Sequence, residues 1–233
     1  MVFRAKKTVV EVAVSPAKFE NIRSVTKQKA AKISLVTEQK ISRTSLGDFV
    51  AHLNALSSCY EEECDFPDHE PRSYSYALGQ AIVKSLDELS VWVKSKPFFD
   101  DAVSQIGRTY ILSEDRFVQA AALRLLSTQP TSLENLLAIL EGVFNQGYDA
   151  NLVAPTLKEL ERYKDPQDLV RINEVLAQAL LTGAPFLAEE VSLRMAPFVD
   201  GASFGFYKEL LGQLPGDSVY YHNLESILNL ASR

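Results

Sequence analysis

Apolar residues along most of this chain recur at steps of three and four, which is the spacing of one face of an α-helix. The segment "TSLGDFVAHLNALSS" is a clear example, and its apolar face consists of Leu46, Phe49, Val50, Leu53 and Leu56. From Ser75 to the carboxyl end the same periodicity continues, interrupted by short breaks that contain Gly, Pro, Ser or Asp. The pattern predicts helices of about 12–16 residues joined by short loops, with antiparallel packing between neighbours.

Three columns of apolar residues repeat along this helical region. They are Leu136, Ile172 and Phe206; Leu140, Leu176 and Leu210; and Leu123, Leu157 and Leu193. Within each column the two steps are 34 and 36 residues, in one order or the other, and Ile106 lies 34 residues before Leu140. A period near 35 residues with two helices per unit predicts an α-solenoid. A coincidence of ordinary helix lengths is the alternative interpretation.

The stretch "EDRFVQAAALRLLSTQP" resembles the first helix of a HEAT-like repeat. Such repeats carry an Asp, a Val and an Ala-Leu-x-x-Leu core at the positions of Asp115, Val118, Ala121, Ala122, Leu123 and Leu126. The stretch "AEEVSLRMAPF" at 188–198 is a weaker match, and the resemblance covers residues 75–233. It implies an all-α fold, an α-solenoid of antiparallel helix pairs with an N-terminal helical cap. The chain departs from the family in lacking most of the usual Asp/Arg pairs and in carrying Pro155 and Pro185 in first turns.

Charge is unevenly distributed. Residues 1–46 carry ten Lys/Arg and three Asp/Glu, a net charge of +7, whereas residues 47–233 carry 14 Lys/Arg and 27 Asp/Glu, a net charge of −13. We expect a basic N-terminal arm and helical cap over residues 1–57, a cysteine-containing loop over 58–74 and a helical repeat domain over 75–233. Opposite charge favours an arm that lies against the acidic body over an arm that binds an anionic partner.

Both cysteines of the chain, Cys59 and Cys64, lie in the loop, with four residues between them. A zinc ion needs about four ligands, and adding His52 and His69 gives His-x6-Cys-x4-Cys-x4-His, which matches no common zinc finger. A redox pair more usually reads Cys-x-x-Cys. The spacing therefore favours a disulfide over free thiols and over a metal site. An oxidised pair in turn implies a periplasmic or secreted location.

The segment "GASFG" at 201–205 matches the Gly-x-Ser-x-Gly nucleophile elbow, and Asp217 and His222 follow Ser203 in hydrolase order. That elbow requires a strand before the serine, whereas the surrounding pattern is helical, so we expect Ser203 to be a helix N-cap. No Walker loop, dinucleotide fingerprint, HExxH or EF-hand motif occurs. We therefore expect a protein that is not an enzyme and has no cofactor and no metal.

Stacked helical repeats expose an extended surface, which favours a non-catalytic protein–protein interaction scaffold or adaptor with an unidentified protein partner. The candidate partner-binding residues lie between the core columns: Asn135, Arg171, Glu174, Gln178, Lys208 and Glu209. Each of them also fits ordinary solvent-facing polarity. No apolar run approaches the ~18 residues of a transmembrane segment.

The alternative function is nucleic-acid binding by a HEAT-like protein, including a DNA glycosylase-like enzyme. Such a site needs a basic concave face and aromatic residues around a catalytic Asp. The body of this chain is acidic and the whole chain has one Trp, so the composition argues against nucleic acid.

Overall fold

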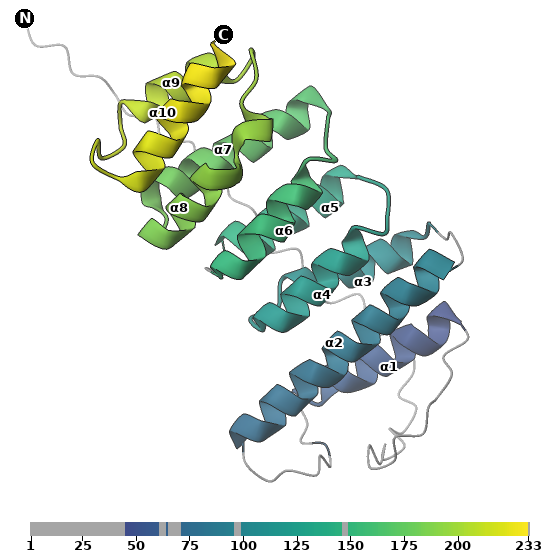
Figure 1. Ribbon diagram of the computed structural model, residues 1–233. Coiled ribbons are helices and arrows are strands. Elements are labelled where there is room, and N and C mark those ends of the chain that lie inside the picture. The colour runs from purple at the N-terminus through teal and green to yellow at the C-terminus, as the bar shows by residue number, and fades with distance from the viewer. Residues whose placement is uncertain (1–44, 61–63, 65–70, 96–98, 146–148, 233) are drawn as a thin grey trace, which may run out of the picture. The chain divides into compact units, whose positions relative to one another are not determined.

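The computed structural model describes residues 45–60, 64, 71–95, 99–145 and 149–232 (Figure 1). Every regular element in these residues is a helix, which confirms the all-α prediction. The helices belong to one compact unit. The basic arm up to residue 44, with its expected packing on the acidic body, and His69 lie outside the described residues.

The helices follow in chain order with short connections. They are α1 (Leu46–Ser58), α2 (Pro71–Ser95), α3 (Asp101–Ile111), α4 (Arg116–Leu126), α5 (Leu133–Leu140), the π-helical turn η2 (Glu141–Asn145), α6 (Ala150–Leu160), α7 (Pro166–Thr182), α8 (Pro185–Arg194), the 3₁₀ turn η3 (Ala196–Phe198), α9 (Phe204–Leu211) and α10 (Val219–Ala231). α2 begins at Pro71, inside the segment expected to be a loop, because proline is tolerated in the first turn of a helix.

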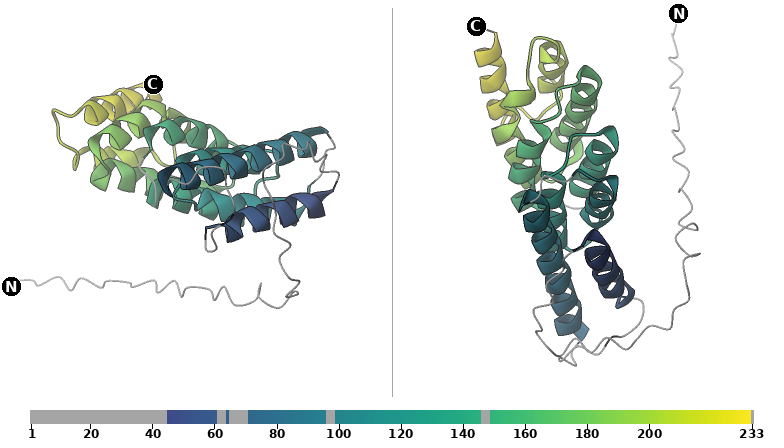
Figure 2. Two further views of the ribbon diagram at one scale, coloured as in Figure 1. Left: turned by 90° about the horizontal axis from the view of Figure 1, so that it is seen from below. Right: turned by 90° about the vertical axis from the view of Figure 1, so that its right-hand side faces the viewer.

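Contacts between helices arrange them in two rows (Figure 1, Figure 2). In the first row, α2 packs on α4, α4 on α6, α6 on α8 and α8 on α10. The second row consists of α3, α5, α7 and α9. Within it α3 packs on α5 and α5 on α7, while α9 packs on α10 of the first row. From α4 onward the first-row helices begin at Arg116, Ala150, Pro185 and Val219, so successive starts are 34, 35 and 34 residues apart. The interval found in the sequence is therefore present in the positions of these helices.

Side-chain caps determine where most of these helices begin. Each capping oxygen accepts a hydrogen bond from a backbone N–H of the first turn that has no partner within the helix. The caps are Asp100, Ser132 and Asp165 in the second row and Asp115, Asp149 and Ser218 in the first row. All of these capping residues except Asp100 lie in the breaks predicted from the helical pattern, so those breaks mark helix starts.

One of the three apolar columns is buried throughout. Its members, Leu140, Leu176 and Leu210, are 4%, 0% and 3% exposed. In each of the other two columns the last residue is exposed instead of buried: Phe206 is 43% and Leu193 is 57% exposed. The strict period therefore predicts the core well near the middle of the chain and less well toward the carboxyl end.

The two exceptions have local causes. α8 buries Leu187, Val191 and Met195, which are four residues apart. Leu193 is two residues beyond Val191, or about 200° around the helix, and so faces away from this stripe. In α9 the buried position belongs to Tyr207, whose hydroxyl donates a hydrogen bond to Oδ1 of Asn173 in α7. The core position next to the exposed Phe206 is therefore taken by Tyr207, while Leu210 keeps its predicted buried position.

The π-helical turn η2 follows α5 and lies close to the carboxyl end of the neighbouring helix α3. A Cβ at Gly142 would overlap the carbonyl oxygen of Ile111, so glycine is required for this approach. The buried amide of Gln119 donates to the carbonyl oxygens of Gly142 (2.9 Å) and Ile111 (3.3 Å). The Gln119 amide thereby gives a donor to the Ile111 carbonyl at the end of α3 and to the Gly142 carbonyl in η2. Regular helical hydrogen bonding is incomplete at both places.

Candidate partner-binding site

Cys59 and Cys64 form a disulfide, with Cα atoms 5.3 Å apart, as the spacing predicts. The hydroxyl of Tyr74 in α2 donates to the carbonyl of Cys59 (2.7 Å) and accepts from the N–H of Cys64 (3.0 Å). One covalent bond and two hydrogen bonds therefore tie the ends of this loop together. The oxidised sulfurs are not zinc thiolates, and the described residues contain no group of three His, Cys, Asp or Glu side chains suited to a metal ion.

Ser203 lies at the start of α9 as expected, but its side chain makes no capping bond there. Its hydroxyl, which is buried, donates to the carbonyl of Phe198 (3.0 Å) and to Asp200 Oδ1 (2.9 Å). Hydrogen bonds from Ser203, led by that of its backbone N–H, hold the pKa of Asp200 below its usual value. No described contact joins Ser203 to His222, whose Nδ1 lies 3.8 Å from Glu225 Oε2. The serine closes a turn between η3 and α9.

Asn135 is a structural residue and not an exposed partner-binding residue. It is 1% exposed, its Oδ1 accepts from Arg108 Nη1 (2.9 Å), and its Nδ2 donates to the carbonyl of Pro130 (3.2 Å). A polar residue is suited to this buried position because Arg108 of α3 donates a hydrogen bond to it. Four of the other candidates are exposed: Glu174 and Gln178 on α7, and Lys208 and Glu209 on α9. Arg171 on α7 is half-buried.

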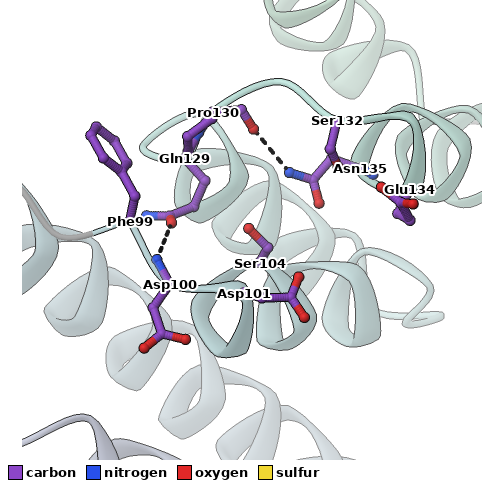
Figure 3. A pocket seen from close by; sticks show the side chains of 9 residues that line it. All are labelled: Phe99, Asp100, Asp101, Ser104, Gln129, Pro130, Ser132, Glu134 and Asn135. Carbon is purple, nitrogen blue, oxygen red and sulfur yellow. Dashed lines mark hydrogen bonds between the residues drawn. The ribbon is translucent and has the colours of Figure 1, made fainter.

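A hollow of about 250 Å³ lies between the amino ends of α3 and α5 (Figure 3). The two ends meet because α3 packs beside α5 and both helices start at polar caps. We call it the acidic hollow. It is lined by Phe99, Asp100, Asp101, Ser104, Gln129, Pro130, Ser132, Glu134 and Asn135.

The turn between α4 and α5, which forms one wall of the acidic hollow, is held by Arg162, which lies in the turn after α6. The guanidinium donates to the carbonyls of Ser127 (3.2 Å) and Gln129 (2.6 Å) and to Glu159 Oε1 (2.6 Å). Glu159 is 5% exposed. Burial raises the pKa of its carboxyl, while hydrogen bonds from Ser127 and Arg162 act in the opposite direction. An ion pair between the buried Glu159 and the partly exposed Arg162 thus positions a wall of the hollow.

Carboxylates dominate the rim of the acidic hollow. Beside it, Arg108 Nη2 donates to Asp101 Oδ1 and to Gln105 Oε1, both at 2.9 Å. The pKa of Glu134 is held below its usual value by a hydrogen bond from its own backbone N–H and by one from the Ser132 hydroxyl. With Asp100 there are three carboxylates and one guanidinium, which leaves a net charge of −2 at neutral pH. The chemistry of this site suits a cationic or hydrogen-bond-donating group.

A second hollow, of about 170 Å³, lies at the carboxyl end of α7. We call it the α7 hollow. Gln178, one of the candidate residues, lines it and donates from Nε2 to Thr182 Oγ1 (2.8 Å). The complete lining is Phe144, Val175, Gln178, Ala179, Thr182, Gly183 and Leu187. It offers a mainly apolar surface with one amide at its edge.

The acidic hollow was not predicted from the sequence, apart from Asn135, which was expected to be exposed. Asp100 and Ser132 are recognisable N-caps 32 residues apart, and they indicate two helix starts. Their side-by-side position depends on lateral packing of α3 on α5, which the periodicity does not specify. The exposed side chain of Phe99 is the other signal, since it stands directly before the cap.

Among the described residues no helix has both the length and the apolar character that crossing a membrane requires. Comparisons of the chain with protein-family models, with curated proteins and with solved structures found no match.

Proposed function

We propose that residues 75–233 form an α-solenoid of antiparallel helix pairs similar to HEAT repeats. The two rows and the steps of 34 and 35 residues between first-row helices support this architecture. Of the four successive pairs, three pack together: α3 with α4, α7 with α8 and α9 with α10. In the remaining pair α6 contacts η2, the turn after α5, and neighbouring pairs touch along the rows. Such nearest-neighbour contacts are characteristic of repeat proteins.

We further propose that the protein is a non-catalytic scaffold or adaptor that binds a partner protein through its second row. The observation that carries this proposal is the position of the two hollows. The acidic hollow borders α3 and α5, and the α7 hollow borders the carboxyl end of α7. Second-row helices therefore supply much of the lining of both hollows, while Leu187 of α8 adds a first-row side chain to the α7 hollow. Each places polar side chains beside apolar ones.

Exposed apolar side chains on second-row helices add to this surface. They are Leu133 and Leu137 on α5, Val170 on α7 and Phe206 on α9, each more than 40% exposed. The first row also exposes apolar residues, including Val91 and Phe117. Apolar exposure alone therefore does not select a row, and the hollows are what favour the second.

The absence of catalysis is part of the same proposal. It is supported by the buried Ser203 hydroxyl, which is committed to Phe198 and Asp200 and has no described contact with His222. A nucleophilic serine needs a base within hydrogen-bond reach and an exposed oxygen.

The test is quantitative co-purification of proteins with the full chain from the cells that produce it. The variants are Leu137→Glu and Val170→Glu in the second row, with Val91→Glu as the matched first-row control. We expect one protein to co-purify with the wild type and the control and to fall about tenfold with each second-row variant, as a loss of ~1.4 kcal/mol implies. Equal capture by all four proteins contradicts the proposal. A partner released by nuclease treatment supports the nucleic-acid alternative instead.

A further inference from the structure

The side chain of Ser104 points into the acidic hollow and is one of the groups that line it. Ser104 in α3 is 7% exposed. Its backbone N–H donates to the carbonyl of Asp100 (3.3 Å), but its Oγ has no partner among the described residues. Figure 3 shows this hydroxyl directed between Gln129 and Asn135, toward the centre of the hollow. A hydroxyl is both a donor and an acceptor, so this one can bond to a group that enters the hollow.

Anions are poor candidates for this site, although two helix amino ends meet there. The N–H of Ala102 is already bonded to Asp100 Oδ1 (2.8 Å), and the N–H of Asn135 to Ser132 Oγ (3.2 Å). The amino ends are therefore capped within the chain. What remains toward the ligand is a set of acceptor oxygens with a net negative charge, which attracts a cation.

The side chains of Phe99 and Gln129, which line the acidic hollow, indicate which kind of cation fits it. Phe99 is 66% exposed and its ring stands beside Gln129 at the edge of the hollow (Figure 3). An aromatic face beside carboxylates favours a guanidinium, which stacks on rings and donates several planar hydrogen bonds at once. Acceptor oxygens from α3 and α5 surround the hollow, so a multivalent planar donor uses them better than a single ammonium does.

We propose that the acidic hollow binds the guanidinium group of an arginine side chain presented by a partner protein. Asp101 and Glu134 provide the charge, Ser104 Oγ accepts one N–H and the Phe99 ring covers one face of the group. Asp101 retains its bond to Arg108 through Oδ1 and offers its second oxygen. This inference rests on the proposed partner-binding function, because it names the recognition element of the same second-row surface.

The experiment is a titration of the isotope-labelled full chain with N-acetyl-arginine methylamide, followed by the backbone amide resonances in NMR spectra. The citrulline compound, which is nearly isosteric and neutral, and the lysine compound are the matched probes. We expect saturable shifts at Asp101, Ser104 and Asn135 with the arginine probe, and binding about tenfold weaker with the other two. Equal binding of the citrulline or lysine probe, or the absence of saturable shifts at these residues, overturns the proposal.

Variants connect the binding to the named side chains. Ser104→Ala removes a hydroxyl that has no internal partner and should therefore fold normally. We expect Ser104→Ala and Glu134→Gln to weaken the arginine probe about fivefold each, which corresponds to one lost hydrogen bond. Glu209→Gln, an exposed carboxylate on α9, is the control and should bind like the wild type. Wild-type binding by both hollow variants overturns the assignment.

The two proposals fail in distinguishable ways. If a protein depends on Leu137 and Val170 for capture but not on Ser104 or Glu134, the partner-binding function stands and the arginine site is wrong. If the arginine probe binds as described and no protein is captured, the site stands and the proposed function is wrong.

Discussion

Tyr207 donates a hydrogen bond of 2.8 Å to Oδ1 of Asn173, and this contact joins α9 to α7 inside the core. Tyr207 is 0% exposed and Asn173 is 9% exposed. Burial raises the pKa of the Tyr207 hydroxyl, with a smaller contribution from Asp200, so the hydroxyl remains a donor across the ordinary pH range. The bond holds Tyr207 in the core, at the position next to Phe206, which the apolar period predicts to be buried.

Tyr207→Phe should lower the free energy of unfolding by about 1–3 kcal/mol, because it leaves Asn173 Oδ1 buried without a donor. Tyr76→Phe is the matched control, since the Tyr76 side chain is 62% exposed. Urea denaturation of both variants measures the difference. An unchanged midpoint for Tyr207→Phe would mean that the hydroxyl contributes nothing to the core.

Gly142→Ala should destabilise the protein by about 1–3 kcal/mol, because the new methyl group meets the carbonyl oxygen of Ile111. Gly205→Ala in α9 provides the comparison, since a Cβ there meets nothing within 4 Å. Alanine is the better helix former, so this variant should be neutral or stabilising by up to about 1 kcal/mol. Thermal unfolding of the pair gives the answer, and equal shifts in Tm would contradict the close approach of η2 to α3.

The helical class of this fold could be predicted because amphipathic periodicity and N-caps are local properties of the sequence. Asp115 and Asp149 are separated by 34 residues and begin α4 and α6, so two starts could be predicted from their caps and spacing. The exposure of Phe206 could not, because an interaction with a residue of another helix decides which side of α9 is buried.

The site was less predictable for the same reason. Arg171 and Glu174 were expected at the surface from their place between apolar residues, and no contact with another helix buries them. Asn135 occupies a similar place in the pattern but is buried by Arg108 of α3. A polar residue that faces solvent and a buried polar residue that pairs with a neighbouring helix occupy the same kind of position in the hydrophobic pattern. The sequence alone therefore does not distinguish them.

Replacing both Cys59 and Cys64 by Ala should cost about 2 kcal/mol of stability, the value expected for closing so short a loop. Mass spectrometry of the unfolded wild type should show a gain of two hydrogen atoms on reduction. Tyr74→Phe removes only the two hydrogen bonds across the loop and should leave the disulfide intact. Labelling of both thiols in the unreduced protein would contradict the bond.

The buried carboxyl of Glu159 should make stability depend on pH. Burial raises its pKa above the usual 4.5 in the folded chain, so the folded state binds more protons than the unfolded chain just above that pH. Its contribution to stability is complete below pH 4.5 and is lost as the pH rises through the folded pKa.

The measurement is the unfolding free energy of the wild type minus that of Glu159→Gln, from about pH 4 to about pH 7. We expect this difference to fall as the pH rises, because glutamine does not titrate. Glu174→Gln, which removes an exposed carboxylate from α7, is the control for a general change in charge. A difference that is constant with pH, or that rises, contradicts the assignment.

Photo-crosslinking in intact cells measures whether the second row binds a partner protein. A photoreactive phenylalanine analogue would replace Leu137 or Val170 in the second row, and Val91 or Phe117 in the first row, one position at a time. All four side chains are exposed by 46% or more, so the positions are comparable. We predict one and the same crosslinked protein at Leu137 and Val170, with little at the first-row positions. Equal crosslinking from both rows, or crosslinks to nucleic acid at the second-row positions, would contradict the account.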